Sequence, residues 1–253
     1  MSQQARVAFV TGSARGIGMA VAEEFRTKGA SIVIADLDLD EARGTAERLD
    51  PTGAGVLAVE LDVTRTQSVD AAFAATLERF GRLDVLVNNA GTVNPQPSAE
   101  ISDEAWSALL GVHLDGTFRC CRAAYPALCA SPSAAIVSIS SVAARVGIPK
   151  RLSYSAAKAG IEGLTHVLAV EWAPEGIRVN AVAPGYTMTK RMEGTISSGL
   201  LDEAQVTRLI PMRRFADPAE IAHAVHWLAS PEASYVTGQC LYVDGGAVVN
   251  SHW

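Results

Sequence analysis

The chain lacks the sequence features that are typical of nucleic-acid-binding proteins, of membrane-spanning proteins and of secreted proteins. Its 21 Lys and Arg are outnumbered by 27 Asp and Glu, for a formal charge of -6, and no run of five like charges supplies the basic surface that a nucleic acid needs. No apolar segment approaches the ~20 residues that cross a bilayer. No charged leader precedes the first strand-like run. We therefore expect a cytoplasmic protein that binds neither nucleic acid nor membranes.

Cysteine is scarce, and its spacing forms no metal or redox motif. The chain has four, none in a CxxC pair: Cys120, Cys121, Cys129 and Cys240. Buried thiols in a reducing compartment are the simplest expectation for them. His223 and His226 share one face of an expected helix, but the sequence shows no third ligand near them, so we predict no metal site.

The chain does have the composition of a globular protein with ample core material, since 49% of its residues are apolar and 19% are charged. Short apolar runs alternate with helical patterns. The expected strands are 6–10, 31–35, 56–60, 85–87, 135–139, 178–182 and 239–243. The expected helices are 18–28, a segment ending near 49, 68–80, 103–129, 154–172 and 218–229. This alternation predicts an α/β fold, with a parallel sheet covered on both faces, in a single domain over 1–253.

A glycine-rich turn, TGSARGIG at 11–18, lies between the first strand and the first helix. Glycines there permit a tight turn, a close approach of the backbone to a pyrophosphate, and close helix–strand packing. The N-terminus of the following helix favours phosphate groups. Any sharp turn of this kind can use glycine, so it is the placement between strand and helix that indicates a dinucleotide site.

Asp36, at the end of the second expected strand, favours NAD over NADP. A carboxylate there can accept hydrogen bonds from the adenosine ribose hydroxyls, and it would repel a 2′-phosphate. Arg15 argues the other way, because a guanidinium beside the turn could hold that phosphate, although it is also compatible with a solvated loop side chain. We give Asp36 more weight, because it lies where the 2′ group would be, and we predict NAD.

Tyr154 and Lys158 lie one turn apart on one face of an expected helix. Free tyrosine, with a pKa near ~10, is a poor base at neutral pH. An ammonium ~4 Å away contributes roughly 4 kcal/mol at an effective dielectric constant of ~20, which is about three pKa units. The pair thus predicts an acid/base whose pKa lies near working pH. Ser141, just past the strand over 135–139, could donate a hydrogen bond to the substrate oxygen, or could simply cap a turn.

These pieces, taken together, resemble the single-domain branch of the short-chain dehydrogenase/reductase family. The matching motifs appear in family order over nearly the whole chain. They are TGSARGIG at 11–18, Asp36, Asp62-Val63, NNAG at 88–91, Ser141, YSAAK at 154–158, PGYTMT at 184–189 and YVTGQCLYVDGG at 235–246. The resemblance implies a doubly wound, seven-stranded Rossmann sheet. It also implies homo-oligomers, dimers or tetramers, in which the helices over 103–129 and 154–172 pair between subunits.

The resemblance also implies individual roles. Tyr154 would be the general acid/base, Lys158 would lower its pKa and bind the nicotinamide ribose, and Ser141 would orient the substrate oxygen. Asp62 and Val63 would flank the adenine, Asn89 would lie beside the ribose, and Thr187 and Thr189 would hold the carboxamide. The full set of expected cofactor contacts is Gly12, Ser13, Arg15, Gly16, Ile17, Gly18, Asp36, Asp62, Val63, Asn89, Tyr154, Lys158, Pro184, Gly185, Thr187 and Thr189.

His113 departs from the family pattern, which has Asn at this place in a V-N-x-x-G segment. In the family, the backbone carbonyl of this residue holds a water that links the lysine to solvent. One interpretation is that His113 keeps this backbone role and catalysis is unchanged. The other is that its imidazole joins the proton relay and adds a titration near neutral pH. We favour the first, because no charge partner is visible in the sequence.

The segment 186–215 shows the least regular pattern and follows the expected nicotinamide contacts, so we predict a substrate lid. The residues expected to line the substrate pocket are Thr92, Val93, Arg145, Ser141, Tyr186 and Met192. We predict an NAD-dependent oxidoreductase that interconverts a secondary alcohol and a ketone by hydride transfer. Alternatives are an NADP-dependent 3-oxoacyl thioester reductase and, from another class, a nucleotide sensor without turnover.

Overall fold

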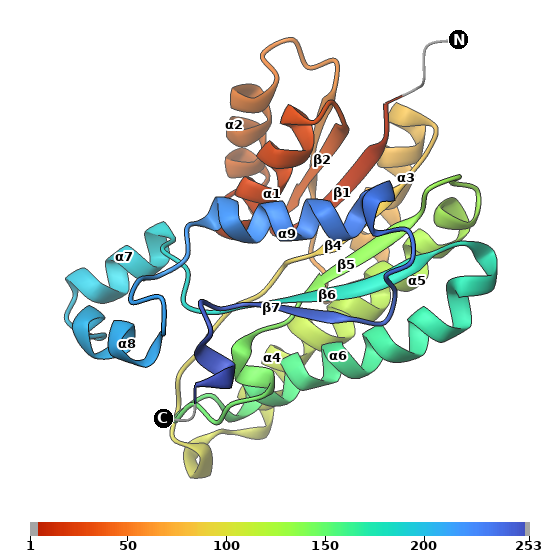
Figure 1. Cartoon of the computed structure of the whole chain (residues 1–253). Helices are drawn as coiled ribbons and strands as arrows, with labels where there is room; N and C mark the ends of the chain where they lie inside the picture. The colour runs from red at the N-terminus through yellow and green to blue at the C-terminus, as the bar shows by residue number, and fades with distance from the viewer. Residues whose placement is uncertain (1–4, 251–253) are drawn as a thin grey trace.

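The computed structural model describes residues 5–250 and contains one seven-stranded parallel sheet (Figure 1). The strand order is β3-β2-β1-β4-β5-β6-β7, and every neighbouring pair is parallel. The strands are β1 Val7–Thr11, β2 Ser31–Asp36, β3 Val56–Glu60, β4 Val85–Asn88, β5 Ala135–Ile139, β6 Arg178–Pro184 and β7 Cys240–Val243. The order reverses direction at β1 and β4, which places a switch point at the carboxyl ends of these two strands.

Helices cover both faces of the sheet, as the sequence predicts (Figure 1). One core lies beneath α1 (Gly16–Thr27), α2 (Leu39–Leu49) and α9 (Pro218–Ala229). The second core lies beneath α3 (Thr66–Phe80), α5 (Gly116–Cys129) and α6 (Leu152–Trp172). Alternate residues of β1 enter opposite cores, because successive side chains of a strand point to opposite faces. Within residues 5–250, no helix is long and apolar enough to cross a membrane.

The expected helix over 103–129 is three segments rather than one regular helix. It comprises α4 (Asp103–Leu110), a π-helical turn over Gly111–Asp115 and α5. Such a turn inserts an extra residue into the helical ladder and often marks a functional site. Here it presents the His113 side chain to the protein interior, where it is 2% exposed. The sequence shows no residue that signals this turn.

The segment over 186–215 is more regular than its sequence pattern suggests. It holds two short helices, α7 (Lys190–Ser197) and α8 (Glu203–Leu209), which stand apart from the sheet (Figure 1). Each begins at a side-chain cap. The Thr189 hydroxyl accepts a hydrogen bond from the Met192 amide, and the Asp202 carboxylate accepts from two amides. Capping of this kind stabilises helices whose apolar periodicity is weak.

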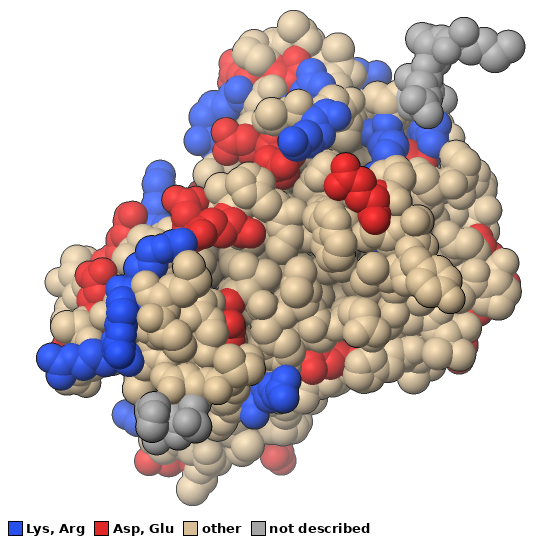
Figure 2. All heavy atoms as spheres, in the orientation of Figure 1, with Lys and Arg blue, Asp and Glu red and all other residues tan. Residues whose placement is uncertain are grey.

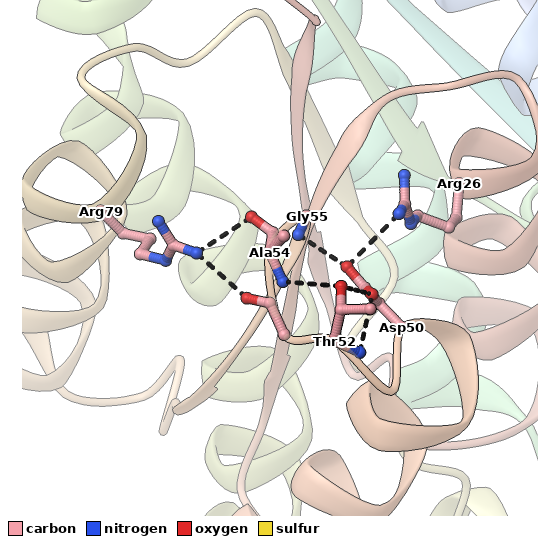
Figure 3. A network of polar contacts seen from close by, with 7 residues as sticks. Arg26, Asp50, Thr52, Ala54, Gly55 and Arg79 are labelled. Atoms are coloured by element: carbon pink, nitrogen blue, oxygen red, sulfur yellow. Dashed lines mark hydrogen bonds and ion pairs between the residues drawn. The ribbon is translucent and has the colours of Figure 1, made fainter.

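A polar network fixes the connection from α2 to β3 (Figure 3). The buried Asp50 carboxylate accepts hydrogen bonds from the Thr52 hydroxyl and the Gly55 amide, and it pairs with Arg26 of α1 at 3.3 Å. Arg79 of α3 donates to the carbonyl oxygens of residues 53 and 54. The hydrogen bonds from Thr52 and Gly55, together with the charge of Arg26, lower the pKa of Asp50. The network fixes the start of β3, which is the edge strand beside the expected adenosine site.

Candidate active site and cofactor cleft

The glycine turn after β1 is a backbone cradle in which side chains would not fit. Gly12 has a φ of +62°, and a Cβ atom there would lie 2.8 Å from Cα of Ala90. A Cβ at Gly18 would lie 2.3 Å from the carbonyl oxygen of Gly12. The α1 helix begins without a side-chain cap at Arg15. Its first amides therefore remain available for an anion.

Two of the expected cofactor residues hold this cradle in place through their side chains. The Asn89 amide donates to the carbonyl oxygens of Thr11 and Gly12 at 2.9 and 2.8 Å. The fully buried Ser13 hydroxyl donates to the Val10 carbonyl and accepts from the Ala35 amide. The sequence predicted that both residues contact the cofactor directly. In the structure, the hydrogen bonds of their side chains stabilise the turn instead.

An acidic cleft lies next to the cradle at the end of β2. Its lining residues are Arg15, Asp36, Leu37, Asp38, Leu39, Asp40 and Glu60. Asp36 is 9% exposed, and its carboxylate accepts hydrogen bonds from the Ala14 and Asp38 amides. Arg15 forms an ion pair with Glu41 at 2.8 Å, so it is not a free cation. The additional acids come from residues that sequence reasoning missed, although Asp38 and Asp40 lie only two and four positions after Asp36 in the chain.

The other expected cofactor residues lie along the same edge of the sheet. Asp62 accepts two hydrogen bonds from Thr64, which lower its pKa, and neighbouring Val63 packs against Gly116. Pro184 ends β6, and Gly185 lies against Asp244. Beyond them, Thr187 forms an isolated bridge with Ala216. A Cβ at Gly16 would lie 3.8 Å from Cγ2 of Thr189, so the base of the lid meets the glycine turn.

Tyr154, Ser141 and Lys158 come together beside β5, from two separate sequence motifs. The Ser141 side chain interacts with Tyr154 and lowers the pKa of its phenol, and the Ser141 hydroxyl also accepts a hydrogen bond from the Ala143 amide at 3.1 Å. The serine is therefore both a turn cap and a partner of the tyrosine. Lys158 is buried, and its ammonium donates to the Ile139 carbonyl at 2.6 Å and lies 5.6 Å from the centre of the Tyr154 ring.

The electrostatics of Tyr154 differ from the sequence-based expectation. Burial raises its pKa, while the Ser141 hydrogen bond and the charges of Arg151 and Arg191 oppose that shift. Burial lowers the pKa of Lys158 to about 7, because a charged ammonium is costly to bury. The lysine is therefore only partly charged at neutral pH, which weakens the effect expected of a full ammonium.

His113 lies beside the reacting residues, with its ring 5.4 Å from that of Tyr154 in an edge-on arrangement. Its Nε2 atom meets the backbone of Thr92, 2.7 Å from the carbonyl oxygen and 3.1 Å from the amide nitrogen. Burial and the positive charge of Lys158 lower the pKa of His113 to about 3. The imidazole is therefore neutral at physiological pH. This favours the interpretation in which His113 replaces the family asparagine without adding a titration.

The expected substrate residues divide into two groups. Thr92, Val93, Tyr186 and Met192 lie on the loop after β4 and at the base of the lid, and Arg191 of α7 donates to the Val93 carbonyl at 2.7 Å. Arg145 instead has its guanidinium over the ring of Tyr242, 5.7 Å from its centre. The basic groups that act on Tyr154 are Arg151 and Arg191, neither of which was predicted as a site residue. Arg151 lies three residues before Tyr154, next to the start of α6, and this spacing could have identified it.

The histidines of α9 lie away from this site. His223 is 3.6 Å from Glu24 of α1, and the His226 ring packs against Phe25. In the described part of the chain, no three His, Cys, Asp or Glu residues are grouped as metal ligands. All four cysteines are free, with Cys120 and Cys121 buried, Cys240 partly buried and Cys129 exposed.

Comparisons with known proteins agree with this geometry. A family model described as enoyl-(acyl carrier protein) reductase matches residues 12–248. The chain is 38% identical to D-threitol dehydrogenase of Mycolicibacterium smegmatis, over 96% of this chain and 93% of the relative. It is 43% identical to cis-4-hydroxycyclohexanecarboxylate dehydrogenase of Sinomonas cyclohexanicum, over 95% of this chain and 96% of the relative.

Solved structures also resemble this chain in fold. A short-chain dehydrogenase/reductase from Brucella melitensis, named glucose/ribitol dehydrogenase, superposes with a TM-score of 0.90 at 33% identity, covering 98% of this chain and 99% of that one. The overall fold of the chain is thus shared with these proteins. The chain belongs to the short-chain dehydrogenase/reductase family of oxidoreductases.

Proposed function

We propose that this protein is an NAD(H)-dependent oxidoreductase that interconverts a secondary alcohol and a ketone. One observation carries the proposal: Tyr154 lies one helical turn from the buried Lys158, and the Ser141 side chain interacts with its phenol. Relatives named for a sugar alcohol and for a cyclic hydroxy acid support a hydroxyl group as the reacting group.

The residues perform acid/base chemistry through their arrangement. In the oxidative direction, the Tyr154 phenolate oxygen accepts the hydroxyl proton of the alcohol, and in reduction it returns that proton to the carbonyl oxygen. The Ser141 hydroxyl donates a hydrogen bond to the same oxygen as charge develops on it. Lys158, held by the Ile139 carbonyl, stabilises the phenolate to the extent that it is charged. His113 stays neutral and packs against the ring.

The glycine cradle fits the pyrophosphate of a dinucleotide, because Gly12 and Gly18 leave no room for a Cβ and the first amides of α1 have no side-chain cap. A bound nicotinamide nucleotide would supply or accept the hydride. Asp36 would hold the adenosine ribose, Asp62 and Val63 would flank the adenine, and Thr187 and Thr189 would lie near the carboxamide.

The charge of the adenosine cleft supports NAD over NADP. Four carboxylates line it, from Asp36, Asp38, Asp40 and Glu60, against one guanidinium from Arg15 that is already paired with Glu41. A 2′-phosphate would bring about two further negative charges among these groups at neutral pH. The repulsion would be strongest at the largely buried Asp36, because screening by solvent is weakest there.

We also infer that copies of the chain associate. Large apolar side chains remain exposed on α5 and α6, including Phe118 at 45%, Val167 at 55% and Val170 at 78%. Figure 2 shows that the face over β7 and much of α6 is almost free of charged side chains, whereas charge gathers over the lid. Exposed apolar surface of this extent is typical of protein interfaces. A homodimer or homotetramer would bury it.

Incubation of the protein with NAD or NADP and a panel of secondary alcohols, monitored by the absorbance of the reduced cofactor, tests the proposal. We expect reduction of NAD with at least one alcohol and loss of that activity in Tyr154→Phe. Cofactor binding should survive in that variant, since the phenyl ring keeps its packing. Intact binding with silence across the whole panel would support a nucleotide sensor instead.

A further inference from the structure

We propose that the substrate carries an anionic oxygen group, a carboxylate or phosphate, which Arg151 and Arg191 bind beside Tyr154. This inference rests on the proposed function, because it names the substrate class of the same site. Arg151 directly precedes α6, three positions before Tyr154, and Arg191 lies on α7 of the lid. The two guanidinium groups therefore come from different elements, and the charges of both act on the reacting tyrosine.

The contacts of Arg191 place it where the lid meets the loop after β4. Its Nη2 atom donates to the Val93 carbonyl at 2.7 Å, joining the lid to the loop after β4. This loop also carries Thr92, which contacts His113 behind Tyr154. A guanidinium has five N–H donors, and the Val93 bond accounts for only one of them. The remaining donors are available to a second acceptor.

Arg151 is the more unusual of the two residues. Its Nη1 atom is buried and has no hydrogen-bond partner among the described residues. A buried polar nitrogen without a partner is rare in proteins and costly, so an acceptor from outside the chain is the natural partner. The charge of Arg151 interacts with both Tyr154 and Tyr186, so its guanidinium lies near the catalytic tyrosine and the base of the lid.

The backbone before Arg151 is held in an uncommon conformation. Lys150 has a φ of +64°, in the left-handed region that non-glycine residues seldom adopt. Its carbonyl oxygen accepts the Gln96 amide at 3.2 Å, which ties this turn to the loop after β4. Strain of this kind persists where the surroundings impose it, and it is concentrated at binding sites. Here it sets the direction in which the chain delivers Arg151.

No carboxylate neutralises these two cations. The ion pairs among residues 5–250 involve other basic residues, and neither Arg151 nor Arg191 takes part in one. The positive charge of Arg191 lowers the pKa of Arg151, so the two guanidinium groups repel each other, and the charges of both also favour the phenolate of Tyr154. An anionic group on the substrate would relieve that repulsion and could accept bidentate hydrogen bonds.

Matched substrate pairs test the proposal. The pairs are 4-hydroxycyclohexanecarboxylate with its methyl ester, 3-hydroxybutyrate with its ethyl ester, and glycerol 1-phosphate with glycerol. The first two probe a carboxylate and the third a phosphate. We expect kcat/KM to be higher for the anionic member of at least one pair, and the pair that shows the preference identifies the anion. Equal or higher kcat/KM for the neutral member of every pair that turns over would overturn the inference.

The variants are Arg151→Gln and Arg191→Gln, with Arg208→Gln as the control. Arg208 is an exposed arginine of the same lid, so this control repeats the change in charge away from the pocket. Each test variant should raise KM for the anionic substrate about tenfold or more, as expected for the loss of a hydrogen bond to a charged group. The neutral partner should change by less than about threefold. Equal losses on both members would indicate a structural role and contradict the proposal.

A binding measurement separates this inference from the proposed reaction. Calorimetric titration with cyclohexanecarboxylate, methyl cyclohexanecarboxylate and inorganic phosphate, in the presence of NAD, needs no turnover. If no alcohol is oxidised but an anion binds the parent and not Arg151→Gln, the anion site stands and the proposed reaction fails. If alcohols are oxidised but no anion binds and no anionic substrate is preferred, the anion site fails and the reaction stands.

Discussion

A Cβ atom on Gly91 would lie 2.4 Å from Cε1 of His113. The imidazole thus fills the space directly beside the backbone at the end of the NNAG segment, and the π-helical turn over Gly111–Asp115 brings it there. Protein interiors are close-packed, so two atoms cannot share this space. The histidine and the glycine depend on each other, although they belong to different motifs.

Gly91→Ala is expected to destabilise the protein through this contact. The added methyl group must displace the buried His113 ring, which also loses its bond to the Thr92 backbone. Overpacking of this kind costs about 1–3 kcal/mol in the free energy of unfolding. Urea denaturation of the parent and the variant would measure the difference.

The double variant Gly91→Ala, His113→Asn provides the control. Asparagine is shorter than histidine, so it leaves space for the methyl group, and the double variant should recover part of the lost stability. A thermodynamic cycle over the four proteins would show coupling of at least about 0.5 kcal/mol for residues in contact. Strict additivity would show that the two side chains do not meet.

The free energy of unfolding should fall more steeply with decreasing pH in the parent protein than in its His113→Asn variant. The pKa of His113 is about 3 in the folded chain and 6.5 without the fold. The unfolded chain therefore binds more protons between these values, and the free energy of unfolding falls as pH drops from 6.5 toward 3. Denaturation at several pH values should show a steeper acid loss in the parent than in His113→Asn.

The low pKa of His113 also predicts how the reaction rate depends on pH. Because the imidazole is already neutral above pH 5, the pH–rate profiles of the parent and His113→Asn should superimpose in shape between about pH 5 and 9. Their absolute rates can differ through packing. A limb near neutral pH that is present only in the parent would place the imidazole in the proton relay.

Asp36→Asn is expected to relax the preference for NAD. The amide keeps one oxygen that can accept the Ala14 hydrogen bond, so the change removes charge with little change in shape. The ratio of kcat/KM for NADP to that for NAD should rise about tenfold or more, which corresponds to ~1.4 kcal/mol of relieved repulsion. Asp70→Asn, an exposed acid of α3, is the matched control and should leave the ratio unchanged. An unchanged ratio in Asp36→Asn would contradict the proposed basis of cofactor selection.

Val170→Glu is expected to reduce the oligomeric state. Val170 is 78% exposed on α6, and a charge placed in a buried apolar interface is costly. Light scattering after size exclusion should show a smaller species than the parent. Val170→Thr has nearly the same shape and should keep the parent state. A monomeric parent at all concentrations would refute the association.

The sequence predicted the element types well because their signals are local. The β-branched runs gave strand limits within one or two residues, and those over 56–60 and 135–139 agree with β3 and β5. The start of α6 was placed at Tyr154, two residues late, because Leu152 and Ser153 precede the recognised motif. The π-helical turn and the two lid helices were missed. A π-helical turn has no distinct periodicity, and short capped helices have too few turns to show one.

What the sequence alone determined about this protein was its set of parts: alternating strands and helices, a glycine turn that only Gly12 and Gly18 could form, and the Tyr154–Lys158 pair on one helix. The tertiary structure decided how the parts act on one another. Burial lowered the pKa of Lys158 and His113, four acids converged on one cleft, and Arg191 was brought to Val93 across 98 residues of sequence. Charge and burial depend on neighbours in space, and these neighbours are set by the packing of distant segments.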